Sequence, residues 1–304
     1  MAKMYVLLVF VMVAWGFNVS ATKLLVDQFM PVTITALRIS TAGISVFIIL
    51  YFLKLLRLPS KKEIPALILG AILNVAGHHY FLSIGLKNTS AVNGGIILGV
   101  GPLITAILSI VLLGSRFTFF KCIGFIIGFA GVLVTVSQGK SEVNGFSSGD
   151  IDVFISIFSQ SLSFILIKKV SKTMDPRLLT GYMLAIGSFL LFIISLLIEP
   201  DGFRNITEGS AIDYFVFFSS AVIATAVGHM CYNHAIGKIG AAETSVFMNL
   251  SPFFSLIGAA LFLNEKIYAT HLTGLVFIIL GVLIGSGAYK QLGKSKRMKH
   301  KLTL

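Results

Sequence analysis

The sequence predicts an all-α integral membrane protein with ten transmembrane helices, arranged as two inverted repeats of five helices each. The chain has a mean hydropathy of +0.93. It has 56% hydrophobic and only 12% charged residues, a balance that soluble domains rarely approach. Apolar runs recur along the whole chain, and its two halves resemble each other. A transmembrane barrel needs alternating strands of about ten residues. These runs are continuous, so we expect helices.

Each apolar run contains about 20 residues, enough for a helix to cross a hydrocarbon core of about 30 Å. We expect spans at residues 4–26, 31–53, 64–85, 91–113, 119–138, 151–170, 177–198, 212–235, 241–263 and 270–289. The first run ends in Val19-Ser20-Ala21, which resembles a signal-peptide cleavage site. Polar Asn18 and the Trp15-Gly16 pair interrupt this run, and further spans follow, so we expect it to remain as a helix.

The charged residues predict the orientation of these spans. If the loops alternate from an inside N-terminus, most of the 24 basic residues fall on one side and most of the twelve acids on the other. The positive-inside rule then places both termini in the cytoplasm and the protein in the plasma membrane. The net charge of +12 is therefore a topology signal. We interpret residues 291–304 as a basic cytoplasmic tail beside anionic lipid, and we expect no nucleic-acid partner.

The two halves of the chain align at an offset of 150 residues. His79 falls on His229, Pro102 on Pro252, and Gly131 on Gly281, while positions before these need an offset of 145 or 146. We therefore expect one five-helix repeat over residues 1–140, a linker over 141–150 and a second repeat over 151–290. Because five is odd, the second copy enters the bilayer from the other side, as in many secondary transporters.

Pro102 and Pro252 lie at the centres of spans 91–113 and 241–263. Proline removes a backbone donor and clashes with the preceding turn. In lipid, such a defect persists where protein or a water-filled cavity covers it. We expect the two prolines to be matched hinges beside a central cavity. The alternative is that both are ordinary prolines, which membrane helices tolerate.

Several short motifs occur along these spans. Trp15, Gly16 and Asn18 lie in the first span, Arg38 lies in the second, and Asn264-Glu265-Lys266 follows the ninth, while the fifth and tenth spans are glycine-rich. Over residues 4–289 the chain resembles the EamA-type transporters of the drug/metabolite transporter superfamily. The resemblance implies two EamA-type repeats, and export of amino acids, related metabolites or toxic analogues, with sugars or nucleotides in some relatives. One departure is Gly114-Ser115-Arg116, which stands where the family usually carries an acid.

Polar residues inside the apolar runs are the candidate substrate contacts, because burying them in a bilayer is costly. The candidates are Trp15, Asn18, Arg38, Asn74, His79, Asn93, His229, Asn233 and Glu243. We expect them around a midplane cavity bounded by spans one, three, four, six, eight and nine, with Arg38 as the outer positive contact.

Several of these candidates have a structural alternative. Arg38 is long enough to extend its charge to the outer interface. Each histidine can instead bond a neighbouring carbonyl. Glu243 can simply occupy a cytoplasmic helix N-terminus. Gly124-x-x-x-Gly128 and Gly281-x-x-x-Gly285 favour close helix contact, either within the fold or at a homodimer face.

Enzyme signatures are weak. The sequence Gly145-Phe146-Ser147-Ser148-Gly149 matches G-x-S-x-G but lies in a polar loop without the strand and helix that a nucleophile elbow needs. H-E-x-x-H, metal-spaced His/Cys clusters, phosphate loops and dinucleotide fingerprints are absent. We therefore predict no catalytic residue, metal or cofactor.

The expected function is export of a small metabolite, such as an amino acid, by alternating access. Its partners would be this substrate and the lipid bilayer, and the sequence fits proton coupling and passive facilitation equally. The alternatives are a membrane-embedded enzyme that uses the histidines as acid/base groups, and a transporter of a sugar, nucleotide or drug-like cation.

Overall fold

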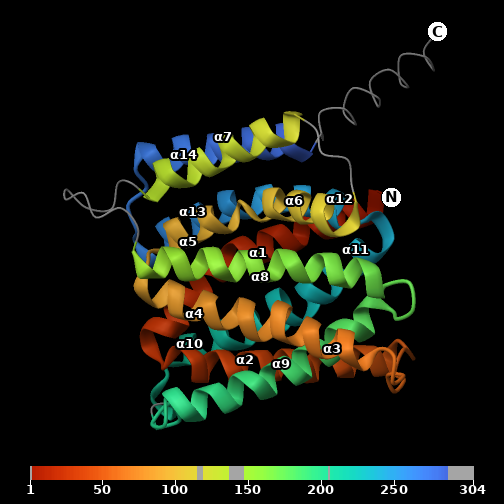
Figure 1. Ribbon diagram of the computed structural model, residues 1–304. Coiled ribbons are helices and arrows are strands. Elements are labelled where there is room, and N and C mark those ends of the chain that lie inside the picture. The colour runs from red at the N-terminus through yellow and green to blue at the C-terminus, as the bar shows by residue number, and fades with distance from the viewer. Residues whose placement is uncertain (1, 115–118, 137–146, 205, 287–304) are drawn as a thin grey trace.

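The computed structural model describes residues 2–114, 119–136, 147–204 and 206–286, and every regular element in these ranges is helical. Figure 1 shows the helices side by side along a common direction, with their connections gathered at two ends. The all-α prediction is therefore confirmed for this part of the chain. The predicted tail lies outside the described residues, as does most of the predicted linker.

The first half comprises α1 (Ala2–Gln28), α2 (Pro31–Phe52), α3 (Ile64–Gly70), the π-helix η1 (Ala71–Gly77), α4 (His78–Asn88), α5 (Ala91–Leu98), α6 (Gly101–Leu113) and α7 (Phe119–Val136). The second half comprises α8 (Ser148–Val170), α9 (Pro176–Ile198), the 3-10 helix η2 (Ile206–Glu208), α10 (Ala211–Ser219), the π-helix η3 (Ser220–Val227), α11 (Gly228–Ile239), α12 (Ala241–Ser245), the 3-10 helix η4 (Val246–Leu250), α13 (Ser251–Leu263) and α14 (Ala269–Ser286).

Eight helical segments of the described chain are long and apolar enough to cross a membrane. They are Lys3–Gln28, Pro31–Phe52, Ile64–Asn88, Ala91–Leu113, Ser148–Val170, Pro176–Ile198, Ala211–Ile239 and Ala241–Leu263. Two further apolar helices are shorter, Cys122–Thr135 within α7 and Ala269–Ile284 within α14. The chain is a multi-pass membrane protein. A count of ten spans remains a prediction, because these two helices fall short of the length of the other eight.

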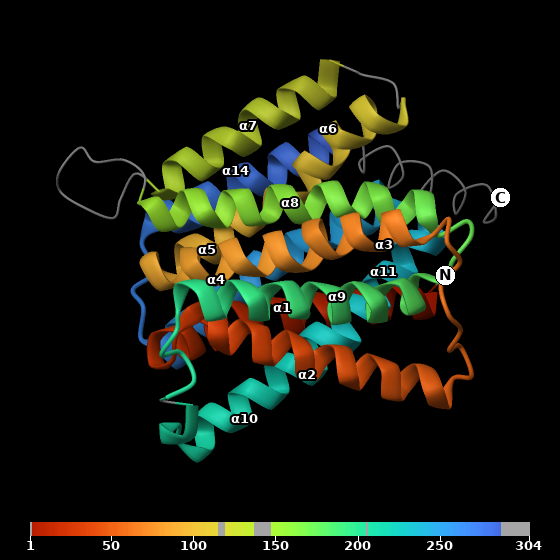
Figure 2. The same cartoon turned by 60° about the horizontal axis from the view of Figure 1, so that its bottom comes forward.

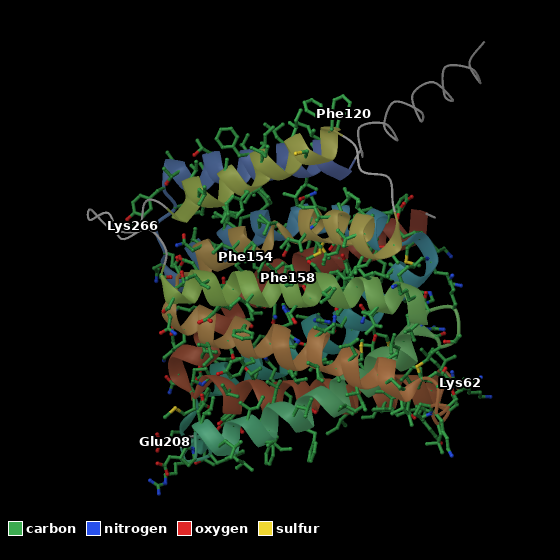
Figure 3. The ribbon with its side chains drawn as sticks, in the orientation of Figure 1. Lys62, Phe120, Phe154, Phe158, Glu208 and Lys266 are labelled. Carbon is green, nitrogen blue, oxygen red and sulfur yellow. The ribbon has the colours of Figure 1, made fainter. Side chains whose placement is uncertain are left out.

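The outer surface of the bundle is rich in apolar side chains, as a lipid-facing surface requires. Phe52 and Leu197 are each 76% exposed, and Phe215 is 72% exposed. Phe120 points away from the bundle at the α7 edge (Figure 3). Exposed apolar area of this extent is not stable in water but is satisfied by lipid chains.

The loops predicted on the outer side meet at one end of the bundle. The Glu199 carboxylate accepts hydrogen bonds from the backbone N–H groups of Val32 (3.0 Å) and Thr33 (2.7 Å), at the start of α2. Glu265 does the same for Ala91 (2.8 Å) and Val92 (2.9 Å), at the start of α5. Both carboxylates satisfy otherwise unpaired N–H groups of a helix N-terminus. They join the second half of the chain to the first.

The loops predicted on the inner side meet at the opposite end. Arg57 pairs with Glu63 at 2.6 Å, and the Tyr182 hydroxyl donates to the carbonyl of Arg57 at 2.8 Å. The Arg57 guanidinium, helped by the backbone N–H of Ser60, lowers the pKa of Glu63 to about 2. Figure 3 shows Lys62 at this end and Glu208 and Lys266 at the other.

Both predicted mid-span prolines lie where a helix breaks and restarts. The helix α5 ends at Leu98, and Pro102 is within the first two residues of α6. Pro252 has the same place in α13, after the 3-10 turn η4. At the start of a helix, the missing proline N–H costs nothing. Both prolines are buried in protein rather than exposed to lipid.

The glycine-rich helices α7 and α14 pack against each other at one edge of the bundle (Figures 1 and 2). A Cβ atom on Gly281 would lie 2.5 Å from the backbone nitrogen of Gly128 and 2.6 Å from the carbonyl oxygen of Gly124. These glycines therefore provide close packing within the fold.

Candidate functional site

A small cavity lies among helices of both halves. It is lined by Trp15, Asn18, Val19, His78, His79, Leu82, Leu98, Ile157, Gln160, Ala224, His229, Met248 and Ser251. These residues come from the six segments around which the sequence predicts a cavity. The cavity volume is about 50 Å³, which is room for a few water molecules. The helices therefore leave little free space at this site.

Three histidines form a cluster in the cavity wall. The ring centroid of His79 lies 4.7 Å from that of His78 and 5.5 Å from that of His229. All three side chains are at most 5% exposed. Among the described residues, neither ring nitrogen of His79 and not the Nδ1 of His229 has a hydrogen-bond partner. The structural alternative for these histidines was a hydrogen bond to a neighbouring backbone carbonyl. No such hydrogen bond is found at those ring nitrogens among the described residues.

His78 contacts Ser156 of the second half through Nδ1. The Ser156 hydroxyl donates to the carbonyl of His78 at 2.8 Å and also lies 2.7 Å from its Nδ1. The carbonyl oxygen of Ser156 lies 3.3 Å from the same nitrogen. Nδ1 of His78 is therefore engaged across the two halves, in contrast to the ring nitrogens of His79.

Trp15 spans the two halves at the cavity. Its indole Nε1 donates to the carbonyl of Ala224 at 2.8 Å, and its ring centroids lie 5.0 Å from His229 and 4.8 Å from Tyr232. Ala224 belongs to the π-helix η3, whose wider turn breaks the regular backbone ladder. The π-helix of the first half is contacted in the same way from the second half. Ser159 of α8 donates to the carbonyl of Leu73 in η1 at 2.8 Å.

Arg38 lies behind the cavity rather than at its outer mouth. It is 1% exposed, so it does not extend to the interface. Its Nη1 donates to the hydroxyls of Ser220 and Thr225, each at 3.1 Å. The Ser220 hydroxyl donates in turn to Oδ1 of Asn18 at 2.5 Å. Arg38 thus reaches the cavity through Ser220 and Asn18, and it does not line the cavity directly.

Four other predicted contacts lie outside the cavity lining. Asn74 donates to the hydroxyl of Ser163 at 2.7 Å, and Asn233 donates to that of Thr180 at 2.9 Å, so both serve helix packing. Asn93 lies in the first turn of α5. Glu243 is exposed in the first turn of α12, as its structural alternative predicts. The cavity therefore retains Trp15, Asn18, His79 and His229 of the predicted set.

Several lining residues were missed by the sequence reasoning but were accessible to it through the repeat. Leu98 and Met248 both line the cavity at the 150-residue offset, as His79 and His229 do. Gln160 also lines the cavity. It is a polar residue inside an apolar span, which is the property that selected the other candidates, and the sequence reasoning overlooked it.

Among the described residues, no group of three or more His, Cys, Asp or Glu side chains is arranged to hold a metal ion. The lining instead combines apolar side chains with neutral donors and acceptors. Such a lining suits reversible binding of a small organic molecule.

Comparison with known families identifies the chain. The family model described as "EamA-like transporter family" matches residues 2–137 and residues 147–286. The chain belongs to the EamA-like transporter family. The resemblance inferred from the sequence motifs is therefore confirmed, and family membership indicates a membrane transporter.

Relatives of this EamA-like protein share most of its length. YyaM of Bacillus subtilis (strain 168), an uncharacterized transporter, is 31% identical over 296 residues, covering 95% of each chain. An uncharacterized transporter of Archaeoglobus fulgidus is 25% identical, covering 93% of this chain and 98% of its own. The WAT1-related protein At3g02690, chloroplastic, of Arabidopsis thaliana is 26% identical, covering 89% of this chain and 66% of its own.

A solved crystal structure has the same fold. It superposes on this chain with a TM-score of 0.69 and 15% sequence identity, covering 96% of this chain and 99% of its own. At that identity, the likeness concerns the fold alone.

Proposed function

We propose that this protein is a secondary transporter that exports small metabolites, such as amino acids, across the plasma membrane by alternating access. One observation carries the proposal. The cavity lies between helices of both halves, and two pairs of its lining residues are 150 positions apart, namely His79 with His229 and Leu98 with Met248. A site that two related halves share can open to either side in turn.

The proposal includes ten spans in two inverted repeats, with both termini in the cytoplasm. It is supported by the family match, which covers two stretches of similar length. It is also supported by matched irregularities, because each half has one π-helical segment and one helix that restarts at a proline. The packing of α7 on α14 completes the bundle in this arrangement.

In this mechanism the halves rock about the cavity, and the breaks before Pro102 and Pro252 absorb the change. Trp15, Asn18, His79 and His229 contact the substrate. Protons remain candidate partners through the histidines, whereas passive facilitation requires no further group. The small cavity of about 50 Å³ suits an intermediate that is sealed on both sides.

Counterflow in liposomes tests the proposal. Purified protein is reconstituted, loaded with one unlabelled amino acid at a time and supplied with the same radiolabelled amino acid outside, with and without a proton gradient. We expect saturable uptake of at least one amino acid, which is lost in His229→Ala and kept in His271→Ala. His271 lies in α14 and bonds the backbone of Tyr268, away from the cavity.

Two outcomes of this experiment favour other functions. Chemical conversion of the solute without net movement would support a membrane-embedded enzyme that uses the histidines. Flux of a sugar, nucleotide or drug-like cation, without flux of any amino acid, would support the transport function with a different substrate class.

A further inference from the structure

The charge of Arg38 has no anionic partner in the described structure. Its side chain is 1% exposed, its Nη1 bonds two neutral hydroxyls, and its Nη2 has no partner among the described residues. The ion pairs of the described chain all lie near the ends of the bundle and do not include Arg38. A buried cation without a counter-charge is unfavourable. An anion that enters this region would be favoured.

The hydrogen bonds of Arg38 set the orientation of a cavity residue. Because Ser220 donates its only proton to Oδ1 of Asn18, its lone pairs are directed to Arg38. With Oδ1 engaged, the amide N–H groups are the donors that Asn18 can offer to a molecule in the cavity that it lines. Hydrogen bonds in series polarise one another, and this series begins at a cation. Asn18 is therefore a strengthened donor.

The lining of the cavity carries no negative charge that would pair with a guest cation. Its lining contains amides, a hydroxyl, imidazoles and apolar side chains, with no Asp or Glu. The buried charge of Arg38 is joined to the cavity wall through Ser220 and Asn18. An ammonium group in the cavity would meet neutral acceptors but no anion, and the charge of Arg38 would repel it. A carboxylate would meet donors and a favourable potential.

We propose that the cavity recognises its substrate by a carboxylate group, that Asn18 donates to this group, and that Arg38 is the positioning residue behind Asn18. No acidic side chain lines the cavity to pair with an ammonium group, so we expect an organic acid to bind at least as well as the corresponding amino acid. The inference rests on the proposed function in taking this cavity as the transport site. It decides between the carboxylate and cationic substrate classes that the sequence leaves open.

The protein contains its own probe for this proposal. Trp15 is the only tryptophan of the chain and lines the cavity, so its fluorescence reports binding without any flux measurement. The full-length protein is titrated with four compounds that share one apolar tail, suited to Val19, Leu82 and Ile157. They are leucine, 4-methylpentanoate, 4-methylpentanamide and 3-methylbutylamine, and sodium chloride serves as a simple anion.

We expect 4-methylpentanoate and leucine to change Trp15 emission saturably. The neutral amide and the amine should bind at least about tenfold more weakly than the carboxylates, because each lacks one charge-assisted hydrogen bond. Equal binding of the amine and the acid would overturn the proposal, and so would the absence of a response to both carboxylates. A response to chloride as strong as that to the acid would replace the carboxylate site by a general anion site.

Variants separate recognition from folding. Asn18→Leu should weaken the binding of 4-methylpentanoate about tenfold and leave the binding of 4-methylpentanamide unchanged. The preference for the carboxylate over the amide would then be lost. Asn74→Leu is the matched control, because Asn74 also bonds a serine of the other half but does not line the cavity. Arg38→Gln should also lose the preference for the carboxylate over the amide, and Arg38→Lys should retain part of it. If neither Arg38 variant folds, Ser220→Ala tests the same connection between Arg38 and Asn18. Unchanged selectivity in Asn18→Leu would contradict the proposal.

Counterflow of radiolabelled leucine distinguishes this inference from the proposed function. Carboxylate binding without counterflow of any solute would leave the recognition site in place and remove the transporter. Counterflow with a preference for amines would leave the transporter in place and overturn the carboxylate site.

Discussion

Gly99 of the first half lies against the ring of Pro252 in the second half. A Cβ atom on Gly99 would lie 2.7 Å from Cγ of Pro252, closer than real Cβ atoms approach. The two proline-associated helix breaks are thus in contact, one from each half. Because Gly99 has no side chain, the helix break in the first half leaves room for the Pro252 ring of the second half.

Gly99→Ala tests this contact. The added methyl group should force the two helices apart and lower the free energy of unfolding by about 1–3 kcal/mol, as overpacking does. Thermal unfolding in detergent measures the change. Gly43→Ala is the control, since a Cβ on Gly43 would make only ordinary contacts at 3.5 Å or more. A Gly99→Ala protein as stable as the control would show that the contact is not tight.

Glu265→Ala should destabilise the protein by about 1 kcal/mol, because two N–H groups at the start of α5 lose their acceptor. Glu243→Ala should change stability by less than about 0.5 kcal/mol, since that carboxyl is exposed. Thermal unfolding of the two variants side by side makes the comparison. A larger loss of stability in Glu243→Ala than in Glu265→Ala would contradict the contacts assigned to these two carboxylates.

Glu63 makes part of the stability dependent on pH. Its pKa falls from an ordinary value of 4.5 to about 2 on folding, chiefly through Arg57. Such a carboxyl stabilises the folded state fully above its unfolded pKa, and this contribution is lost as pH falls through the folded pKa. Glu63→Gln should therefore be less stable than the unmodified protein at neutral pH, with a gap that closes between pH 4.5 and about 2. Urea unfolding at a series of pH values measures it. A gap that stays constant with pH would refute this role.

Gly228→Ala should change the environment of Trp15. A Cβ on Gly228 would lie 2.7 Å from the indole Nε1, which now donates to Ala224. The indole must move, so we expect a shift in tryptophan emission. Gly77→Ala is the matched control in the other half, where the added Cβ would meet Ser159 at 2.7 Å instead. An emission shift in Gly77→Ala, with none in Gly228→Ala, would contradict the assigned contacts.

The sequence predicts the long helical segments well, because apolar run length is a direct consequence of bilayer thickness. It does not predict the partners of Arg38. The hydroxyls of Ser220 and Thr225 reach it from a π-helical segment, and π-helical turns have no strong local sequence signal.

The same irregularity explains one misplaced site residue. Asn74 and His78 would share a face of a regular α-helix, but Asn74 lies in η1, where the wider turn rotates it toward Ser163. Asn233 is misplaced for another reason. It lies one turn, about 6 Å, beyond His229, where α9 already packs. The cavity therefore includes His79 and His229 but neither Asn74 nor Asn233.

Side-specific labelling of repeat mates tests the central claim, that the two halves are oppositely oriented around one cavity. Leu58 and Glu208 are 150 residues apart, and both are exposed. Leu58→Cys and Glu208→Cys are each made in a background with Cys122 and Cys231 replaced by serine, and intact cells are treated with an impermeant thiol reagent. We predict labelling of Glu208→Cys in intact cells and of Leu58→Cys only after permeabilisation. Labelling of both positions from the same side would contradict the account.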